Sequence, residues 1–261
     1  MAGALALALA APAAADDPFD GNWRFSVTPY LWLPSISGST TFVAPNGGGT
    51  SLSTDVNADS YLKSLEMAAM ITGEVRKGEW SAFTDYIYLD FGNQKSQVKG
   101  VTGPLGNPIG SIEAGSSGSL KGSVWTLAGS YTAWRDKGSH LDVLAGFRYL
   151  SLDGKLNWSL AGPLGALTPT GAVSKSFDKW DGIVGVKGQV RFGDTPWFMP
   201  YYADIGSGSA NWTWQALLGV GYQYGWGAVT LSVRNLSYDF NGSDKSNVRF
   251  TGPALSATFT F

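Results

Sequence analysis

Residues 211–226, NWTWQALLGVGYQYGW, contain the clearest period-two pattern in the chain. One set of alternate residues is wholly apolar and has large aromatic side chains at both ends: Trp212, Trp214, Ala216, Leu218, Val220, Tyr222, Tyr224 and Trp226. The intervening residues are mainly polar or small. Because successive side chains of a β-strand point to opposite faces, this stretch predicts a strand whose two faces contact different environments.

The same alternation recurs along the whole chain. Nine further stretches show it, at 22–34, 65–76, 79–91, 123–135, 140–152, 178–192, 196–206, 228–240 and 249–261. Most are near the roughly 9–11 residues that a tilted membrane strand needs. In 79–91 the apolar residues share a parity with Asp85, which suggests a β-bulge. We predict an all-β fold, a transmembrane antiparallel up-and-down β-barrel of about ten strands, with a range of about 8–12.

The connections between these stretches differ in length. Tight turns are expected around 77–78, 136–139, 193–195 and 225–227, and long loops at 38–64, 93–118 and 157–177. Transmembrane barrels combine short periplasmic turns with long outer loops in this way. In 38–64, Asn57 or Asp59 could cap a short helix through Leu65. That loop either folds inward and plugs the barrel or stays exposed.

The first residues have the composition of a secretory signal. Ala4–Ala11 are apolar, and Ala13–Ala15 supply a small-x-small cleavage pattern, so residues 1–15 are expected to be a signal peptide and 16–261 the barrel. A basic segment before the apolar stretch is missing, which suggests that the true start lies upstream. The alternative is a disordered Ala-rich tail.

Alternation alone does not distinguish a soluble barrel from a membrane barrel, but aromatic placement does. Charged residues make up 15% of the chain, against about 25% in an average soluble protein. Aromatic side chains gather at strand ends, as in the girdles of membrane barrels. The predicted interface aromatics are Trp212, Trp214, Tyr222, Tyr224 and Trp226. These features favour a barrel with its apolar face toward lipid and its polar face toward the lumen.

The final strand ends in Phe261 and resembles the C-terminal signature of bacterial outer-membrane barrels. That resemblance implies that Phe261 is an assembly signal for the barrel-assembly machinery. The stretches TPYLWLPSISGST (28–40), 200–226 and LSVRNLSYDF (231–240) resemble a group of largely uncharacterised Gram-negative outer-membrane proteins. The likeness implies a bacterial outer-membrane location, with outer-membrane lipid around the barrel. It supplies no catalytic motif.

An inward polar face would place charges of both signs in the lumen. The predicted lumen-lining residues are Arg24, Glu74, Arg148, Asp181, Lys187, Arg191, Asp204 and Arg234. In one interpretation these charges pair and fill the barrel, since about eight strands are just filled by side chains. In the other they line a narrow pore, with the cations on one wall and Asp181 and Asp204 on another, and set its ion preference.

Several chemistries have no support in the sequence. Cysteine is absent, and no phosphate-binding loop or metal-ligand cluster occurs, so no cofactor or metal is expected. The net charge of −2 gives no reason to expect a nucleic-acid partner. The single histidine, His140, lies beside a predicted turn and is interpreted as structural rather than catalytic.

Three functions remain open. The leading hypothesis is a non-enzymatic narrow channel for small polar solutes or ions. The alternative is a structural or surface-interaction barrel with a filled core that displays loops. A lipid- or peptide-acting barrel enzyme is the least favoured.

Overall fold

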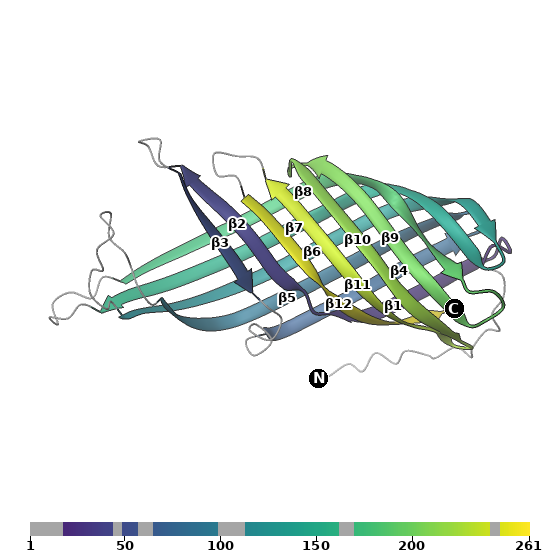
Figure 1. The fold of residues 1–261 in the computed structure, drawn as a ribbon, viewed down its shortest axis with the longest axis horizontal. Helices are drawn as coiled ribbons and strands as arrows, with labels where there is room; N and C mark the ends of the chain where they lie inside the picture. Colours follow the sequence, from purple (N-terminus) through teal and green to yellow (C-terminus); the bar gives the residue numbers. More distant parts are fainter. Residues whose placement is uncertain (1–17, 44–48, 57–64, 99–112, 162–169, 241–245) are drawn as a thin grey trace, which may run out of the picture.

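The computed structural model describes residues 18–43, 49–56, 65–98, 113–161, 170–240 and 246–261 (Figure 1). These residues form twelve strands: β1 (Trp23–Trp32), β2 (Ser35–Val43), β3 (Gly49–Val56), β4 (Leu65–Lys77), β5 (Trp80–Val98), β6 (Glu113–Asp136), β7 (Ser139–Ala161), β8 (Thr170–Arg191), β9 (Trp197–Gly208), β10 (Trp212–Tyr224), β11 (Gly227–Phe240) and β12 (Ser246–Thr260). No helix in these ranges is long and apolar enough to cross a membrane.

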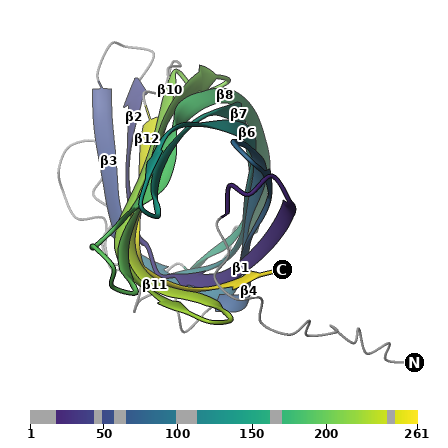
Figure 2. The same cartoon turned by 90° about the vertical axis from the view of Figure 1, so that its right-hand side faces the viewer.

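Ten of the strands close into a ring. The order is β1-β4-β5-β6-β7-β8-β9-β10-β11-β12, every pairing is antiparallel, and β1 also pairs with β12 from Ser26↔Thr260 to Trp32↔Ala254 (Figure 2). After Pro34 the chain continues as β2, which pairs with the far half of β12, and β3 pairs with β2. The predicted antiparallel barrel of about ten strands is therefore confirmed.

One rim of the barrel carries the short turns. They connect β4 to β5, β6 to β7, β8 to β9 and β10 to β11, and the last residue lies at the same rim (Figure 1). Phe261 extends the closure there, because its N–H and C=O both bond to the backbone of Phe25, at 2.8 and 3.1 Å. The β4–β5 turn is tight because Gly78 adopts a φ of 57°, a conformation that favours glycine.

The opposite rim is extended by unusually long strands. β5 to β8 have 19 to 24 residues, whereas β9 to β12 have 12 to 15. The segments 38–64, 93–118 and 157–177, predicted as loops, are therefore partly strand. Their many Gly, Asn and Pro residues lower the strand propensity, but pairing with long neighbouring strands satisfies their backbone groups. The helical turn proposed after Asn57 or Asp59 falls on 57–64, outside the described residues.

The bulge suggested for 79–91 is not inside that stretch. Asp85 to Asp90 pair without interruption on both sides, and the register shifts lie between Leu65 and Met67 and between Phe91 and Gln94. Asp85 and Ile87 both point into the barrel, where both are buried. The parity is mixed because the interior changes from polar to apolar along this strand.

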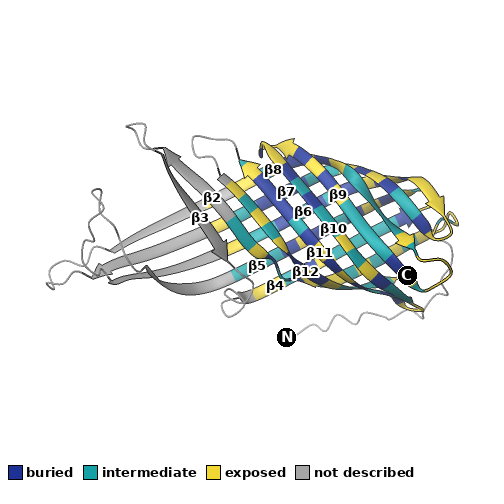
Figure 3. Cartoon of the chain, in the orientation of Figure 1, coloured by how far each residue is buried: buried dark blue, intermediate teal, exposed yellow. Residues whose placement is uncertain are grey.

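Apolar side chains cover the outside of the barrel. On β10, Leu218 and Val220 are exposed, whereas Thr213 and Gln215 are buried in the interior. Buried and exposed positions alternate along the strands in the part of the barrel nearer the short turns (Figure 3). A soluble barrel has the reverse arrangement, because its apolar face fills the core.

Candidate functional site: the barrel interior

Aromatic side chains form two clusters on the outer surface of the barrel. Near the short turns, rings follow one another at 4.7 to 5.5 Å between centroids: Trp197, Tyr222, Tyr224, Trp226 and Phe259. Another group holds Trp125, Phe147, Tyr149 and Trp180. Trp212 is exposed and Trp214 half-buried at the other end of β10. All five predicted interface aromatics thus lie on the outward face of β10 and its turn.

A cavity of about 960 Å³ opens at the short-turn rim; we call it the cup. Its lining includes charged and amide side chains: Arg24, Glu74, Arg76, Lys137, His140, Gln189, Arg191, Asp194 and Gln223. β1, β11 and β12 add six hydroxyls: Ser26, Thr230, Ser232, Ser256, Thr258 and Thr260. The cup therefore combines charged groups with hydroxyls and opens away from the long strands.

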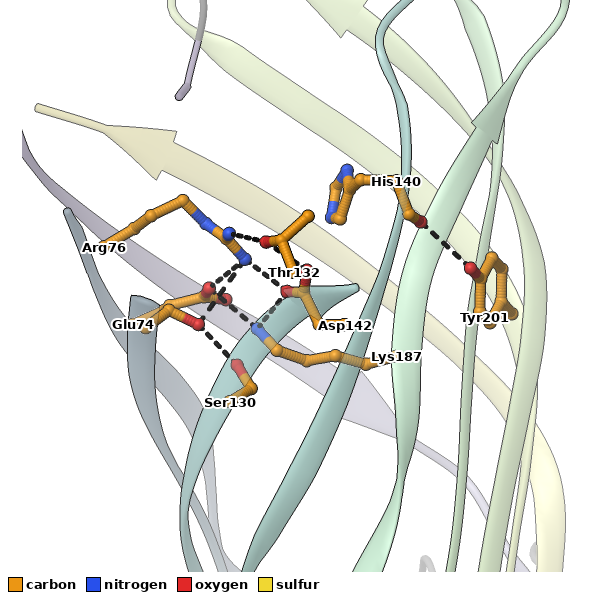
Figure 4. A network of polar contacts seen from close by, with 9 residues as sticks. Glu74, Arg76, Ser130, Thr132, His140, Asp142, Lys187 and Tyr201 are labelled. Carbon is orange, nitrogen blue, oxygen red and sulfur yellow. Dashed lines mark hydrogen bonds and ion pairs between the residues drawn. The ribbon is translucent and has the colours of Figure 1, made fainter. Parts of the chain in front are cut away.

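A network of ion pairs forms the floor of the cup (Figure 4). Lys187 Nζ on β8 contacts Glu74 on β4 at 2.7 Å. Arg76 binds Glu74 at 3.1 Å, donates to Thr132 Oγ1 at 2.8 Å and forms an ion pair with Asp142. In the ring order β4-β5-β6-β7-β8, Lys187 and Glu74 are four strands apart. Two side chains from nearly opposite walls therefore meet in the lumen.

Beyond the floor, an apolar layer crosses the lumen. Phe83, Ala128, Leu144 and Ile183 form a buried cluster with Tyr202 packed against it. The rings of Phe83 and Tyr202 are 6.0 Å apart and nearly perpendicular, although β5 and β9 are four strands apart in the ring. Lys187 Nζ lies 5.0 Å from the Phe83 ring. This layer separates the floor from the centre of the barrel.

Two buried ion pairs occupy the centre. Arg148 and Asp204 are both 0% exposed and bind each other, and Arg148 also donates to Thr126 and Thr213. Arg234 binds Asp85 at 2.5 Å, with exposed side-chain fractions of 5% and 8%. β11, β12, β1, β4 and β5 are consecutive neighbours in the ring, so Arg234 and Asp85 lie on strands four apart, as Lys187 and Glu74 do.

Further side chains form hydrogen bonds with the Arg234–Asp85 pair. The hydroxyl of Tyr30 accepts from Arg234 at 2.8 Å and donates to Asp85 at 2.8 Å. Thr72 donates to Asp85 at 2.8 Å, and Gln215 accepts from Arg234 at 2.9 Å. A buried pair is tolerated when additional hydrogen bonds complete its coordination in this way. These hydrogen bonds hold the two charged side chains in one position.

A second apolar layer lies on the long-strand side of these pairs. Its members are buried: Trp32, Met70, Ile87, Val124, Leu150, Ala210, Leu236, Tyr238 and Ala254. Tyr30, Leu89, Leu152, Phe240 and Phe250 pack against it. Going along the barrel axis from the cup, the lumen is thus filled by a charged floor, an apolar layer, a charged centre and another apolar layer.

All eight predicted lumen-lining residues lie on the inward face. Arg24, Glu74 and Arg191 line the cup, and Lys187 lies at its floor. The other four are buried in the centre: Arg148, Asp181, Asp204 and Arg234. Instead of forming two walls of opposite charge, Arg148 and Asp204 bind each other. Asp181 accepts a hydrogen bond from the backbone of Ala210.

Some residues of this interior carried little signal in the sequence. No partner of Asp85 is evident from the sequence, yet it accepts hydrogen bonds from Tyr30 and Thr72 and forms an ion pair with Arg234. Its partners come from β1, β4 and β11, and no local spacing identifies them. Within the described residues, no group of three His, Cys, Asp or Glu side chains is placed to hold a metal ion.

Residues 18–22 form a short arm at the mouth of the cup; the purple trace in Figure 2 begins here. The ring of Phe19 lies 4.8 Å from the guanidinium carbon of Arg135 and 5.1 Å from that of Arg76. It also meets the ring of His140 edge to face, with centroids 5.5 Å apart. His140 therefore packs against the arm through Phe19.

A carboxylate of the arm itself, that of Asp20, attaches the arm to β1. Asp20 binds Arg24 at 3.1 Å and accepts from the backbone and side-chain nitrogens of Asn22 at 2.8 and 2.9 Å. The backbone bond from Asn22 is the main reason that the pKa of Asp20 lies below its ordinary value of 3.8. Asp20 is therefore ionised throughout the neutral range.

The comparisons with known proteins concern the fold. No protein-family model matches the chain, and no curated protein matches it in sequence. The outer membrane protease OmpT from Escherichia coli has a TM-score of 0.55 at 12% identity, over 93% of this chain and 98% of that one. The translocator domain of autotransporter NalP from Neisseria meningitidis has a TM-score of 0.37 at 15% identity, over 93% and 91%. The toluene transporter TodX from P. putida has a TM-score of 0.32 at 10% identity, over 92% and 90%.

Of these three, OmpT alone exceeds a TM-score of 0.5, and at 12% identity its likeness extends to the fold and no further. The chain has ten antiparallel strands in a closed ring, an apolar outer surface and a charged interior. This is the fold of a bacterial outer-membrane β-barrel protein.

Proposed function

We propose that this protein is a non-enzymatic outer-membrane barrel with a filled interior, whose long strands carry an interaction surface beyond the membrane. The observation that carries the proposal is the Arg234–Asp85 pair, which joins strands four apart in a ring of ten. The contacts Lys187–Glu74 and Phe83–Tyr202 also join strands four apart in the ring. Three successive levels of the lumen are thus bridged by side chains.

The long strands support the second part of the proposal. β5 to β8 exceed the roughly 9–11 residues that cross a bilayer by about ten residues each. They project past the other strands of the ring at the end opposite the short turns (Figure 1). Under the outer-membrane interpretation this rim faces the exterior, because short turns are periplasmic. A paired sheet presents a firmer surface than unpaired loops would.

The channel hypothesis makes the opposite prediction for the same molecule. It is favoured by the cup, which admits solutes from one end, and it requires the layers beyond the floor to separate. Each separation would expose a buried charge or apolar cluster, so conduction would be rare or would need a trigger. The two hypotheses therefore differ in what a folded barrel does in a planar bilayer.

The deciding experiment is single-channel recording of residues 16–261, refolded and confirmed as a barrel by heat-modifiable electrophoretic mobility. We expect no discrete steps. A general porin reconstituted in the same bilayers is the positive control and should give discrete steps, which shows that the assay detects a pore. Discrete steps from the unaltered protein, with an ion selectivity that changes in Lys187→Glu, would instead establish the channel.

Surface display is tested separately. An epitope inserted between β5 and β6 should be accessible to antibody on intact Gram-negative cells, whereas one in the β6–β7 turn should not. Accessibility of the turn epitope alone would reverse the orientation and remove the support for an external interaction surface.

A further inference from the structure

The cup carries more positive than negative side chains. Its charged lining residues, His140 aside, are Arg24, Arg76, Lys137, Arg191, Glu74 and Asp194. Glu74 is already bound by two cations, Arg76 and Lys187. Arg191 donates to a backbone carbonyl at 3.4 Å and meets no carboxylate within 4.0 Å among the described residues. Arg24 pairs with Asp20 and Arg76 with Asp142, so Arg191 and Lys137 are the cations of the cup that form no ion pair within the described residues.

Several nitrogens that line the cup also lack a partner. Arg24 Nε, Arg191 Nε and His140 Nδ1 are buried and make no hydrogen bond within the described part of the chain. Buried polar atoms are usually satisfied, so three unsatisfied nitrogens in one cavity indicate a place that solvent or a ligand completes. All three residues line the cup.

The N-terminal arm shows what kind of group the cup accepts. The carboxylate of Asp20 occupies Arg24, and the ring of Phe19 lies against Arg76 and Arg135. With the arm in place, the cavity still has a volume of about 960 Å³. That volume is within the range of small-molecule sites, roughly 300–1,000 Å³. The hydroxyls of β1, β11 and β12 add hydrogen-bond donors for oxygen atoms.

We propose that the cup binds a soluble anion with two or more carboxylate or phosphate groups, entering from the short-turn rim. Arg191 and Lys137 contact one anionic group and Arg24 another. The N-terminal arm competes with this anion, because the carboxylate of Asp20 must leave Arg24 before the ligand can bind the guanidinium of Arg24. Binding needs no passage through the filled lumen, so this site is independent of whether the barrel conducts.

The test is isothermal titration of refolded residues 16–261 in a non-ionic detergent and a phosphate-free buffer, with citrate and with pyrophosphate. We expect saturable binding with one site per chain. Arg191→Gln should weaken it about tenfold, the effect of losing one charge-assisted contact. Asp20→Asn should strengthen it severalfold, because a larger fraction of molecules then has Arg24 available.

The matched control is Arg249→Gln, which removes an exposed positive charge on β12 and should leave the affinity unchanged. If Arg191→Gln does not fold, Lys137→Gln at the exposed turn replaces it. Absence of saturable binding to both anions in the unaltered protein and in Asp20→Asn would overturn the proposal. An equal loss in Arg249→Gln would also overturn it, because it would indicate attraction by overall charge. Unchanged or weaker binding in Asp20→Asn would reject the competition by the arm.

Discussion

At the scale of single residues, the interior depends on charges that find partners across the lumen. Asp85 illustrates this, since its two oxygens accept from Tyr30, Thr72 and Arg234 on three other strands. Arg148 and Asp204 are paired with no exposure to solvent. An unpaired charge in such a place is costly, so each partner is needed for the stability of the other.

Replacing Asp85 with Ala should therefore be strongly destabilising. The change leaves Arg234 buried without its carboxylate, and we expect the free energy of unfolding to fall by about 3–5 kcal/mol. Urea unfolding of the protein in lipid vesicles, followed by tryptophan fluorescence, measures this change. The matched control is Asp90→Ala, which removes the partner of the exposed Lys121 and should cost about 0–1 kcal/mol. If the two variants lost the same free energy of unfolding, the buried Arg234–Asp85 pair would contribute no more to stability than the exposed pair.

At the scale of elements, the ring closes where the first and last strands meet. β12 pairs with β1 along one half and with β2 along the other, in one continuous antiparallel register that runs from Trp32↔Ala254 to Ser35↔Thr251. Phe261 adds two backbone bonds to Phe25 at the end of this seam. In a hydrocarbon environment an open strand edge leaves polar groups unsatisfied, so closure at this seam is required for insertion.

Deleting Phe261 should reduce the amount of assembled barrel. The deletion removes both backbone bonds to Phe25 and the terminal aromatic ring, which the resemblance to bacterial outer-membrane barrels predicts to be an assembly signal. We expect a clear fall in heat-modifiable protein in outer-membrane fractions. The control is Phe261→Tyr, which keeps the ring and the backbone and should assemble normally. Normal levels after deletion would argue against a role for this residue in assembly.

At the scale of the whole molecule, the distribution of polarity is the reverse of that in a soluble protein. Apolar and aromatic side chains face outward, and ion pairs lie inside. On β10 the outward row runs from Trp212 through Leu218 to Tyr224, so Leu218 lies midway between aromatic residues at the two ends. This position should correspond to the middle of the hydrocarbon layer.

A charge at that position should destabilise the barrel according to its depth. We expect Leu218→Arg to cost about 2–4 kcal/mol in lipid vesicles, because Leu218 is 55% exposed on the outward face. The same substitution at Tyr224, near the short turns, should cost about 0–1 kcal/mol. Reversible urea unfolding of both variants gives the comparison. A similar small cost at the two positions would mean that this face does not contact hydrocarbon.

The sequence alone determined the outline of this protein. Alternation predicted the strands of the ring and their approximate number, whereas most of β2 and all of β3 lie in a segment expected to be a loop. The short turns specified the antiparallel order, and aromatic residues such as Trp212 and Tyr224 indicated which face is outside. These features are local, because the two faces of a strand are set by a period of two residues. The candidate lumen residues followed from the same parity, and all eight lie on the inward face.

The tertiary structure alone decided what the inward residues do. Arg234 and Asp85 are 149 positions apart in sequence, and Lys187 and Glu74 lie on strands four apart in the ring, so no local pattern connects them. The length of β5 to β8 was also hidden, because Gly- and Ser-rich segments become strand only when neighbours supply the pairing. The position of Phe19 and Asp20 over the cup had no sequence signal. Parity fixes the direction of a side chain, whereas ring closure fixes which side chain it meets.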